Sequence, residues 1–225
     1  SVANLASTCW NQGRWEEAEM LQVQVMEISK TKLGWDHPDT LTSMANLALT
    51  YWNEGRWEEA EQLQVQVMQT SKTKLGGDHP DTLRSMANLA STYSNQGQWE
   101  EAKQLLVQTM QTSKTKLGGD HPDTLSSMAN LAATYWKQGK WDEAEQLEVQ
   151  VMETRKAKLG ADHPDTLASM ANLAFTWKSS GYNTRALDLL RHCLAKQRQI
   201  LGLNHHVTVS NSQTLLEWET EVLNL

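Results

Sequence analysis

Apolar residues recur along this chain with the spacing of amphipathic helices. They stand three and four positions apart from Leu41 to Tyr51, and after Gly55 the same spacing returns from Trp57 to Met68. Such spacing places the apolar side chains on one face of a helix. Glycine can adopt the left-handed conformation that ends a helix, and little chain separates the two stretches. The pattern therefore predicts two helices joined by a tight turn.

This helix pair returns every 42 residues. Its copies are marked by the asparagines Asn4, Asn46, Asn88, Asn130 and Asn172. A single pair has too little apolar surface to be stable alone, so the pairs stack, and a constant small rotation per copy gives a right-handed superhelix. We expect an all-α fold, a right-handed superhelical solenoid of antiparallel helix pairs.

Each predicted first helix follows the phrase DHPDTL. Asp36 or His37 can cap its free amides, Pro38 suits its first turn, and Asp39 favours the positive end of the helix dipole. The C-terminal sequence loosens this pattern and has His206 where the other copies have proline. We therefore expect five helix pairs over residues 1–201 and a capping helix over residues 202–225.

The first copy is expected to be truncated. Ser1 aligns with Ser43, which lies inside a first helix, so no DHPDTL phrase precedes it and we expect the chain to be a fragment. Apolar residues meant to stack on an earlier copy would then be uncovered, and they predict self-association through the N-terminal repeat. These residues are Val2, Leu5, Cys9 and Leu21.

The repeated positions resemble a known family. The signature positions of a tetratricopeptide hairpin are occupied by Leu47, Ala48, Tyr51, Gly55, Trp57, Ala60 and Val67. The longer unit with LGxDHPDTL resembles the kinesin-light-chain class of these repeats, and the near-identical copies most resemble the C-terminal repeat region of fungal NOD-like receptor proteins. The resemblance implies the ligand-recognition segment of a larger signalling protein. This chain departs from the family pattern in the middle of the second helix. The usual bulky aromatic is replaced there by Gln22, Gln64, Leu106 and Glu148.

Composition narrows the possible partners. The formal charge of -7 and a pI near 5.5 disfavour both nucleic acid and anionic membranes. No apolar run approaches the roughly 20 residues needed to cross a bilayer, and the N-terminal sequence lacks the features of a signal peptide. Cys9 and Cys193 stand in distant copies and are expected to be reduced. We expect a cytoplasmic protein without a cofactor.

Three recurring features could suggest chemistry but have structural explanations. The HPD histidines, at positions 37, 79, 121 and 163, are too far apart to share a metal ion and fit a capping role. The glutamates of WEEAE match the helix dipole and have no basic or nucleophilic partner at fixed spacing. The tryptophans after the hairpin glycine could form a binding row, but we expect packing between helices for Trp15, Trp57, Trp99 and Trp141. We find no catalytic constellation.

Sequence variation concentrates on one side of the first helix. After MANLA the copies carry Ser7, Leu49, Ser91, Ala133 and Phe175 in turn. Three residues further on they carry Trp10, Trp52, Ser94, Trp136 and Lys178. Earlier in the helix they carry Thr42, Arg84, Ser126 and Ala168. In the tetratricopeptide family the first helix supplies the concave wall, so the varying stripe predicts a binding groove into which Trp52 and Trp136 protrude.

The asparagines one turn away do not vary. Their amides could hold the main chain of an extended peptide, or they could bond a neighbouring helix and fix the hairpin angle. The predicted binding residues are Asn46, Leu49, Trp52, Asn53, Arg84, Asn88, Ser91, Asn130, Ala133, Trp136, Lys137, Asn172 and Phe175. We expect a scaffold that binds a protein or peptide with aromatic and acidic residues. The alternative is a structural array whose repeats stack between molecules.

Overall fold

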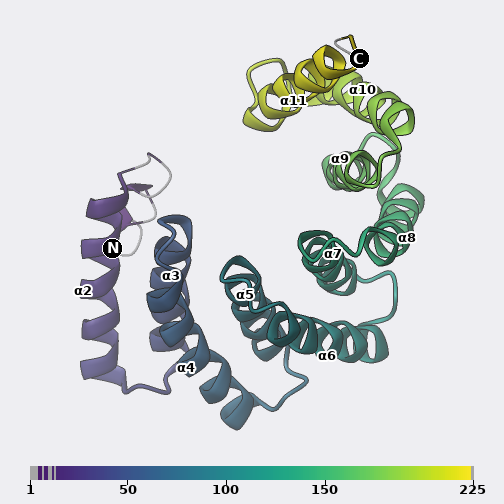
Figure 1. Cartoon of the computed structure of the whole chain (residues 1–225). Helices are drawn as coiled ribbons and strands as arrows, with labels where there is room; N and C mark the ends of the chain where they lie inside the picture. The colour runs from purple at the N-terminus through teal and green to yellow at the C-terminus, as the bar shows by residue number, and fades with distance from the viewer. Residues whose placement is uncertain (1–4, 7, 10–11, 13, 224–225) are drawn as a thin grey trace. The chain divides into compact units, whose positions relative to one another are not determined.

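The computed structural model of the chain describes residues 5–6, 8–9, 12 and 14–223, and every regular element in these residues is a helix (Figure 1). The first helices of the copies are α3 (Pro38–Asn53), α5 (Pro80–Asn95), α7 (Pro122–Lys137) and α9 (Pro164–Ser179). The second helices are α2 (Trp15–Leu33), α4 (Trp57–Leu75), α6 (Trp99–Leu117), α8 (Trp141–Leu159) and α10 (Asn183–Ile200). Helix α11 (His206–Leu223) follows them.

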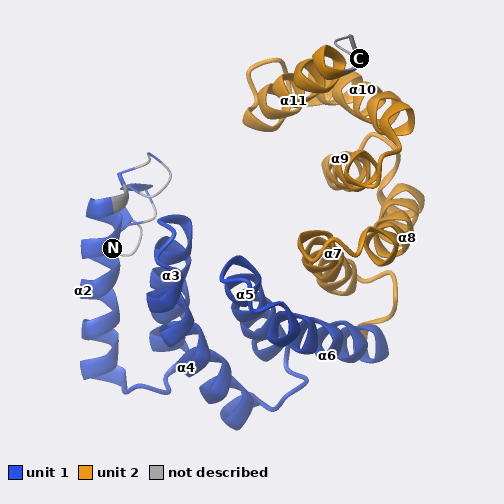
Figure 2. Cartoon of the chain, in the orientation of Figure 1, with its two compact units in different colours: residues 1–116 blue, residues 117–225 orange. Residues whose placement is uncertain are grey.

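The chain divides into two compact units, unit 1 (residues 1–116) and unit 2 (residues 117–225), shown in blue and orange in Figure 2. In unit 1, helices α2, α3, α4 and α5 pack in chain order, and in unit 2 helices α7 to α11 do the same. Packing of each helix on its sequence neighbours is the hallmark of a repeat solenoid. The predicted all-α solenoid of helix pairs is confirmed, and the division at residue 201 stays a prediction.

The first helices begin at a histidine cap. His37 Nδ1 accepts a hydrogen bond from the Asp39 backbone N–H at 3.2 Å, and Pro38 follows the cap directly. The same bond of 3.2 Å recurs at His79, His121 and His163. Proline suits this first position because its missing N–H would have no helical partner there. Histidine, rather than the preceding aspartate, is therefore the cap.

The aspartate before each capping histidine forms an ion pair within its own copy. It pairs with a lysine near the C-terminal end of the following second helix, which ties the two ends of the helix pair together. The pairs are Asp36–Lys74, Asp78–Lys116, Asp120–Lys158 and Asp162–Lys196. The side chains are largely exposed, so the pairs fix loop geometry more than they add stability.

Neighbouring copies in unit 1 are linked by hydrogen bonds that are partly or fully buried. The Thr50 hydroxyl in α3 donates to Gln22 Oε1 in α2 at 2.7 Å, and the Thr92 hydroxyl in α5 donates to Gln64 Oε1 in α4 at 2.7 Å. These glutamines stand where the family has a bulky aromatic. A hydrogen bond therefore replaces part of the apolar packing at these junctions.

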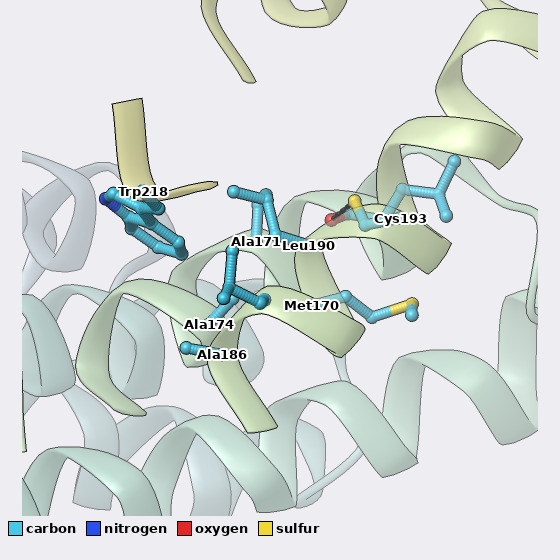
Figure 3. Close-up of a cluster of buried hydrophobic side chains, with 9 residues drawn as sticks. Met170, Ala171, Ala174, Ala186, Leu190, Cys193 and Trp218 are labelled. Carbon is cyan, nitrogen blue, oxygen red and sulfur yellow. Dashed lines mark hydrogen bonds between the residues drawn. The ribbon is translucent and has the colours of Figure 1, made fainter. Parts of the chain in front are cut away.

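A cluster of buried apolar side chains fills the place in unit 2 where α9, α10 and α11 meet (Figure 3). Ala174 and Ala186 are fully buried, and their small size lets α9 and α10 approach closely. Trp218 of α11 covers this cluster and is 7% exposed. The buried Cys193 thiol donates to the Leu167 carbonyl at 3.1 Å, and burial raises its pKa to about 11. Because it is buried, the Cys193 thiol is unreactive and has a structural role.

Among the residues that the structure describes, no helix combines the length and the apolar character that crossing a membrane requires.

Candidate peptide-binding pocket

The asparagines of unit 1 face outward. Asn46 in α3 and Asn88 in α5 are exposed, and neither side-chain amide forms a hydrogen bond with any residue of the described chain. The hypothesis that these amides bond a neighbouring helix and fix the hairpin angle therefore finds no support in unit 1. Leu49, which follows in α3, is 47% exposed. These three side chains form an accessible edge of the first helices in unit 1.

Other predicted residues of unit 1 are occupied within their own helices. The Asn53 amide donates to the Leu49 carbonyl at 2.7 Å, and the Ser91 hydroxyl donates to the Ala87 carbonyl at 3.2 Å. Trp52 is half-buried, and its indole N–H is buried without a hydrogen-bond partner in the described residues. The expectation that Trp52 protrudes freely is therefore only partly met.

A pocket of about 360 Å³ lies between α3, α4 and α5. We call it the α3–α4–α5 pocket. Its apolar lining comes from Leu41 and Ala45 of α3 and from Val67 of α4. The predicted residues Arg84 and Asn88 line it from α5. The structure thus brings together two of the predicted binding residues around a cavity that the sequence did not reveal.

Buried polar groups also line the α3–α4–α5 pocket. Gln64 and Ser71 of α4 are 7% and 3% exposed. The Gln64 carbonyl oxygen accepts the bond from Thr92, whereas the Gln64 amide nitrogen and the Ser71 hydroxyl form no hydrogen bond with the described residues. Sequence reasoning missed both residues because it considered only the first helices. The replacement of an aromatic by Gln64 was the available signal.

Charged side chains at this pocket are paired. Arg84 donates to Asp81 Oδ1 at 2.8 Å, and its side chain remains 73% exposed. Lys74 pairs with Asp36, and this hydrogen bond lowers the pKa of the Asp36 carboxyl. Because Arg84 has five N–H donors, its fork can hold Asp81 and still offer donors to a ligand.

In unit 2 the predicted residues lie differently. The Trp136 indole N–H donates to the Ser179 hydroxyl at 2.9 Å, which joins α7 to α9, and Trp136 is 38% exposed. Ala133 and Asn172 are exposed, and Asn130 is half-buried. Partial burial lowers the pKa of Lys137 at the end of α7. The Trp136 indole N–H therefore helps to hold α7 against α9, while part of the side chain stays exposed.

Phe175 belongs to the core of unit 2. It is half-buried and makes an edge-to-face contact with Trp218, at 5.3 Å between ring centroids. Lys178, one turn later, pairs with Glu221 of α11 at 2.7 Å. Since α11 covers both side chains, Phe175 stabilises the packing of α9 against α11. Its binding role stays a prediction.

The packing predicted for the tryptophans after the hairpin glycine is wrong for two of them. Trp99 and Trp141 are 41% and 40% exposed, whereas Trp57 is half-buried and the Trp15 side chain lies outside the described part. Each begins a helix, and side chains of helical residues tilt toward the N-terminus. Trp99 and Trp141 are therefore too exposed to be packed between helices.

At the N-terminus, Leu5 is 53% exposed, whereas the equivalent Leu47 is 2% exposed. Leu21 is half-buried, but Cys9 is 1% exposed, so the expectation that Cys9 is uncovered is wrong. Val2 lies outside the described residues, as do Asn4, Ser7 and Trp10.

Glu148 in α8 stands at the position of Gln22 and Gln64. It is 7% exposed, and its Oε2 atom has no hydrogen-bond partner among the described residues. Burial raises the pKa of Glu148 to about 7, with a smaller opposing effect from Thr176. A carboxyl group thus occupies the place of an amide in unit 2.

Nothing in the described residues resembles a metal centre. No group of three or more His, Cys, Asp or Glu side chains there is arranged to hold an ion. The loop histidines instead cap helices through Nδ1.

The fold and its loops define a class of repeat protein. Models of the tetratricopeptide repeat match residues 1–72, 45–115, 88–157 and 166–206. The chain therefore belongs to the tetratricopeptide repeat family.

Among solved structures, the chain is similar to the nearly identical TPR-like repeats of a kinesin light chain-like protein from Podosopora anserina. The two share 33% identity over 88% of this chain and 93% of that chain, with a TM-score of 0.76. BtubC (BKLC) from P. vanneervenii is 18% identical over 89% of this chain and 80% of its own, with a TM-score of 0.73. The quorum sensor NprR from B. thuringiensis is 15% identical over 96% of this chain and 56% of its own, with a TM-score of 0.72. The last two share the fold alone, and a comparison with curated proteins finds no match.

Proposed function

We propose that this chain is a peptide-binding scaffold that places one side chain of an extended peptide in the α3–α4–α5 pocket. The observation that carries this proposal is the cavity of about 360 Å³, which is lined by apolar residues of α3 and α4 and by Arg84 and Asn88 of α5. Ligand pockets in proteins commonly hold about 300–1,000 Å³, so this one suits a single large side chain.

The polar residues around the pocket indicate the ligand's chemistry. The free Asn88 amide offers a donor and an acceptor to a peptide main chain. The Arg84 N–H groups that do not contact Asp81 can pair with a carboxylate. A peptide with an aromatic side chain next to an acidic one matches both the pocket and its arginine.

Proteins of the same fold support a peptide ligand. NprR has been solved in complex with its cognate peptide NprX, and a Rap protein has been solved with Competence and Sporulation Factor. For this chain we further propose a place in a larger cytoplasmic signalling protein, as in fungal NOD-like receptors, with the repeats recognising the ligand. The near-identical 42-residue copies support this context.

The test uses the full chain and a phage-displayed library of random linear peptides. Arg84→Ala should weaken an enriched peptide by about tenfold, the scale of one charged hydrogen bond. Arg198→Ala removes an arginine from α10 in unit 2 and serves as the control, with affinity unchanged. Failure of the wild-type chain to enrich any peptide would refute the proposed function.

Self-association through the first repeat is the second candidate. Leu5 supports it, because it is 53% exposed at a position where Leu47 is 2% exposed. Sedimentation velocity over a range of concentrations tests it. Leu5→Lys should abolish any association, whereas a monomer at every concentration would exclude this role.

A further inference from the structure

One position in the second helix differs sharply between the two units. Ser71 in α4 lines the α3–α4–α5 pocket and is 3% exposed. The equivalent residue of α8, two copies later, is Arg155. Asp81 and Ser85 of α5 line the same pocket, and their equivalents in α9 are Asp165 and Ser169.

Arg155 spans the equivalent place in unit 2. Its Nη1 atom donates to the Ser169 hydroxyl at 2.9 Å and to the Asp165 carbonyl at 3.3 Å. The guanidinium thus crosses from α8 to the same two positions that form the α5 wall of the pocket in unit 1. A serine at this position leaves the space open, whereas an arginine fills it with a charged group.

The other lining residues change with it. Arg84 of α5 corresponds to Ala168 of α9, so the arginine comes from the first helix in unit 1 and from the second helix in unit 2. Gln64 of α4 corresponds to Glu148 of α8. The α7–α8–α9 junction therefore presents a different chemistry to a ligand, although its backbone repeats that of the α3–α4–α5 junction.

From this contrast we infer that the residue at the Ser71/Arg155 position determines which side chain a junction accepts. With Ser71, the α3–α4–α5 junction accepts a large apolar side chain of a bound peptide. With Arg155, the α7–α8–α9 junction excludes such a side chain. The inference rests on the proposed function, and it assigns specificity to the second helices as well as to the varying stripe of the first helices.

The charges and volume at the pocket favour this occupant. Asp36 is paired with Lys74 and Asp81 with Arg84, so the rim carries no excess charge that would attract a buried ion. The lining from Leu41 is apolar, and a volume of about 360 Å³ accommodates one large side chain. Burial of such a side chain contributes about tenfold to a hundredfold in affinity.

The first experiment uses N-acetyl-tryptophanamide as a probe on the full chain, followed by NMR of methyl groups. In the wild type the probe should shift the methyl signals of Leu41 and Val67. Ser71→Arg should abolish these shifts, and Ser71→Ala, the matched control, should retain them. Arg155→Ser should create new shifts at Leu125 and Val151, the equivalent residues of unit 2. Circular dichroism verifies that each variant is folded.

The second experiment tests whether residue 71 and the apolar anchor of a bound peptide affect affinity together. For a peptide enriched on the wild type, replacing its apolar anchor by alanine should cost about tenfold or more. The same replacement should cost nothing on Ser71→Arg, because the anchor no longer enters the pocket.

The outcomes separate the two proposals. If folded Ser71→Arg keeps the probe shifts, or Arg155→Ser gains none, the role of this position is refuted. Ser71→Arg is the demanding substitution, so an unfolded Ser71→Arg leaves the decision to Arg155→Ser. If no peptide is enriched on the wild type, the proposed function fails, while the probe still decides the role of Ser71 and Arg155.

Discussion

Replacing Glu148 by glutamine should stabilise the chain in a pH-dependent way. Glutamine is the residue at this position in α2 and α4, where its carbonyl accepts a threonine hydroxyl. Glu148 is 7% exposed, and one of its oxygens has no partner among the described residues. An ionised carboxylate there loses hydration without full compensation, whereas an amide of the same shape does not ionise.

The magnitude follows from the two pKa values of Glu148, about 7 in the folded chain and 4.5 for a free glutamate. Because the folded state holds the proton more tightly, the free energy of unfolding falls as pH rises between these values. Above about pH 7 the loss is complete and amounts to about 3 kcal/mol, at about 1.4 kcal/mol per pKa unit. Glu148→Gln should recover this amount at about pH 8 and under about 0.5 kcal/mol at about pH 4.5.

Urea unfolding followed by far-UV circular dichroism, at both pH values, measures the difference between the variant and the wild type. Glu153→Gln is the matched control, since it removes an exposed carboxylate from the same helix. Taking differences cancels the titration of groups that both chains share. A gain of the same size at both pH values would show that Glu148 does not titrate as its burial demands.

Three further predictions concern caps, tryptophans and asparagines. His79→Ala removes the cap of α5 and should cost about 1 kcal/mol in urea unfolding, with no change meaning that the cap is dispensable. Trp141→Ala should cost well below the roughly 3–5 kcal/mol of a buried aromatic, because the ring is 40% exposed; a full loss would contradict this placement. Replacing Asn46 and Asn88 together by alanine should leave the melting temperature unchanged and weaken every peptide alike in titrations. A folding defect would show that these amides support the scaffold.

The sequence predicted the helices well because local signals mark their ends. Pro38 and the histidine before it fix the start of α3, and Gly55, with a φ of 75°, follows its end. The tryptophan prediction failed because periodicity does not show how far a side chain at the first helical position projects past its helix. Trp99 therefore looked like a packing residue although it is 41% exposed.

The pocket could be predicted only in part. Arg84 and Asn88 belong to the first helices and were found through their pattern of variation and constancy. Ser71 and Gln64 contribute from α4, and their role depends on how α4 rotates against α5, which no spacing in the sequence encodes. Gln64 was visible as a departure from the family pattern, but its partner Thr92 emerges only from the packed helices.

The bonds within and between copies bear on how the gene can change. The ion pair between Asp78 and Lys116 forms within one copy. The hydrogen bond from the Thr50 hydroxyl to Gln22 Oε1 forms between two copies, and the bond from the Thr92 hydroxyl to Gln64 Oε1 repeats it one copy later. An in-frame recombination that removes or adds one full period therefore regenerates the Gln–Thr bond wherever a second helix that carries the glutamine meets the next first helix, whereas the copies with Leu106 and Glu148 at this position lack the glutamine. Copy number and the order of the junctions can change in a single step, so the varying stripes of the first helices can be rearranged while the helix pairs keep their packing.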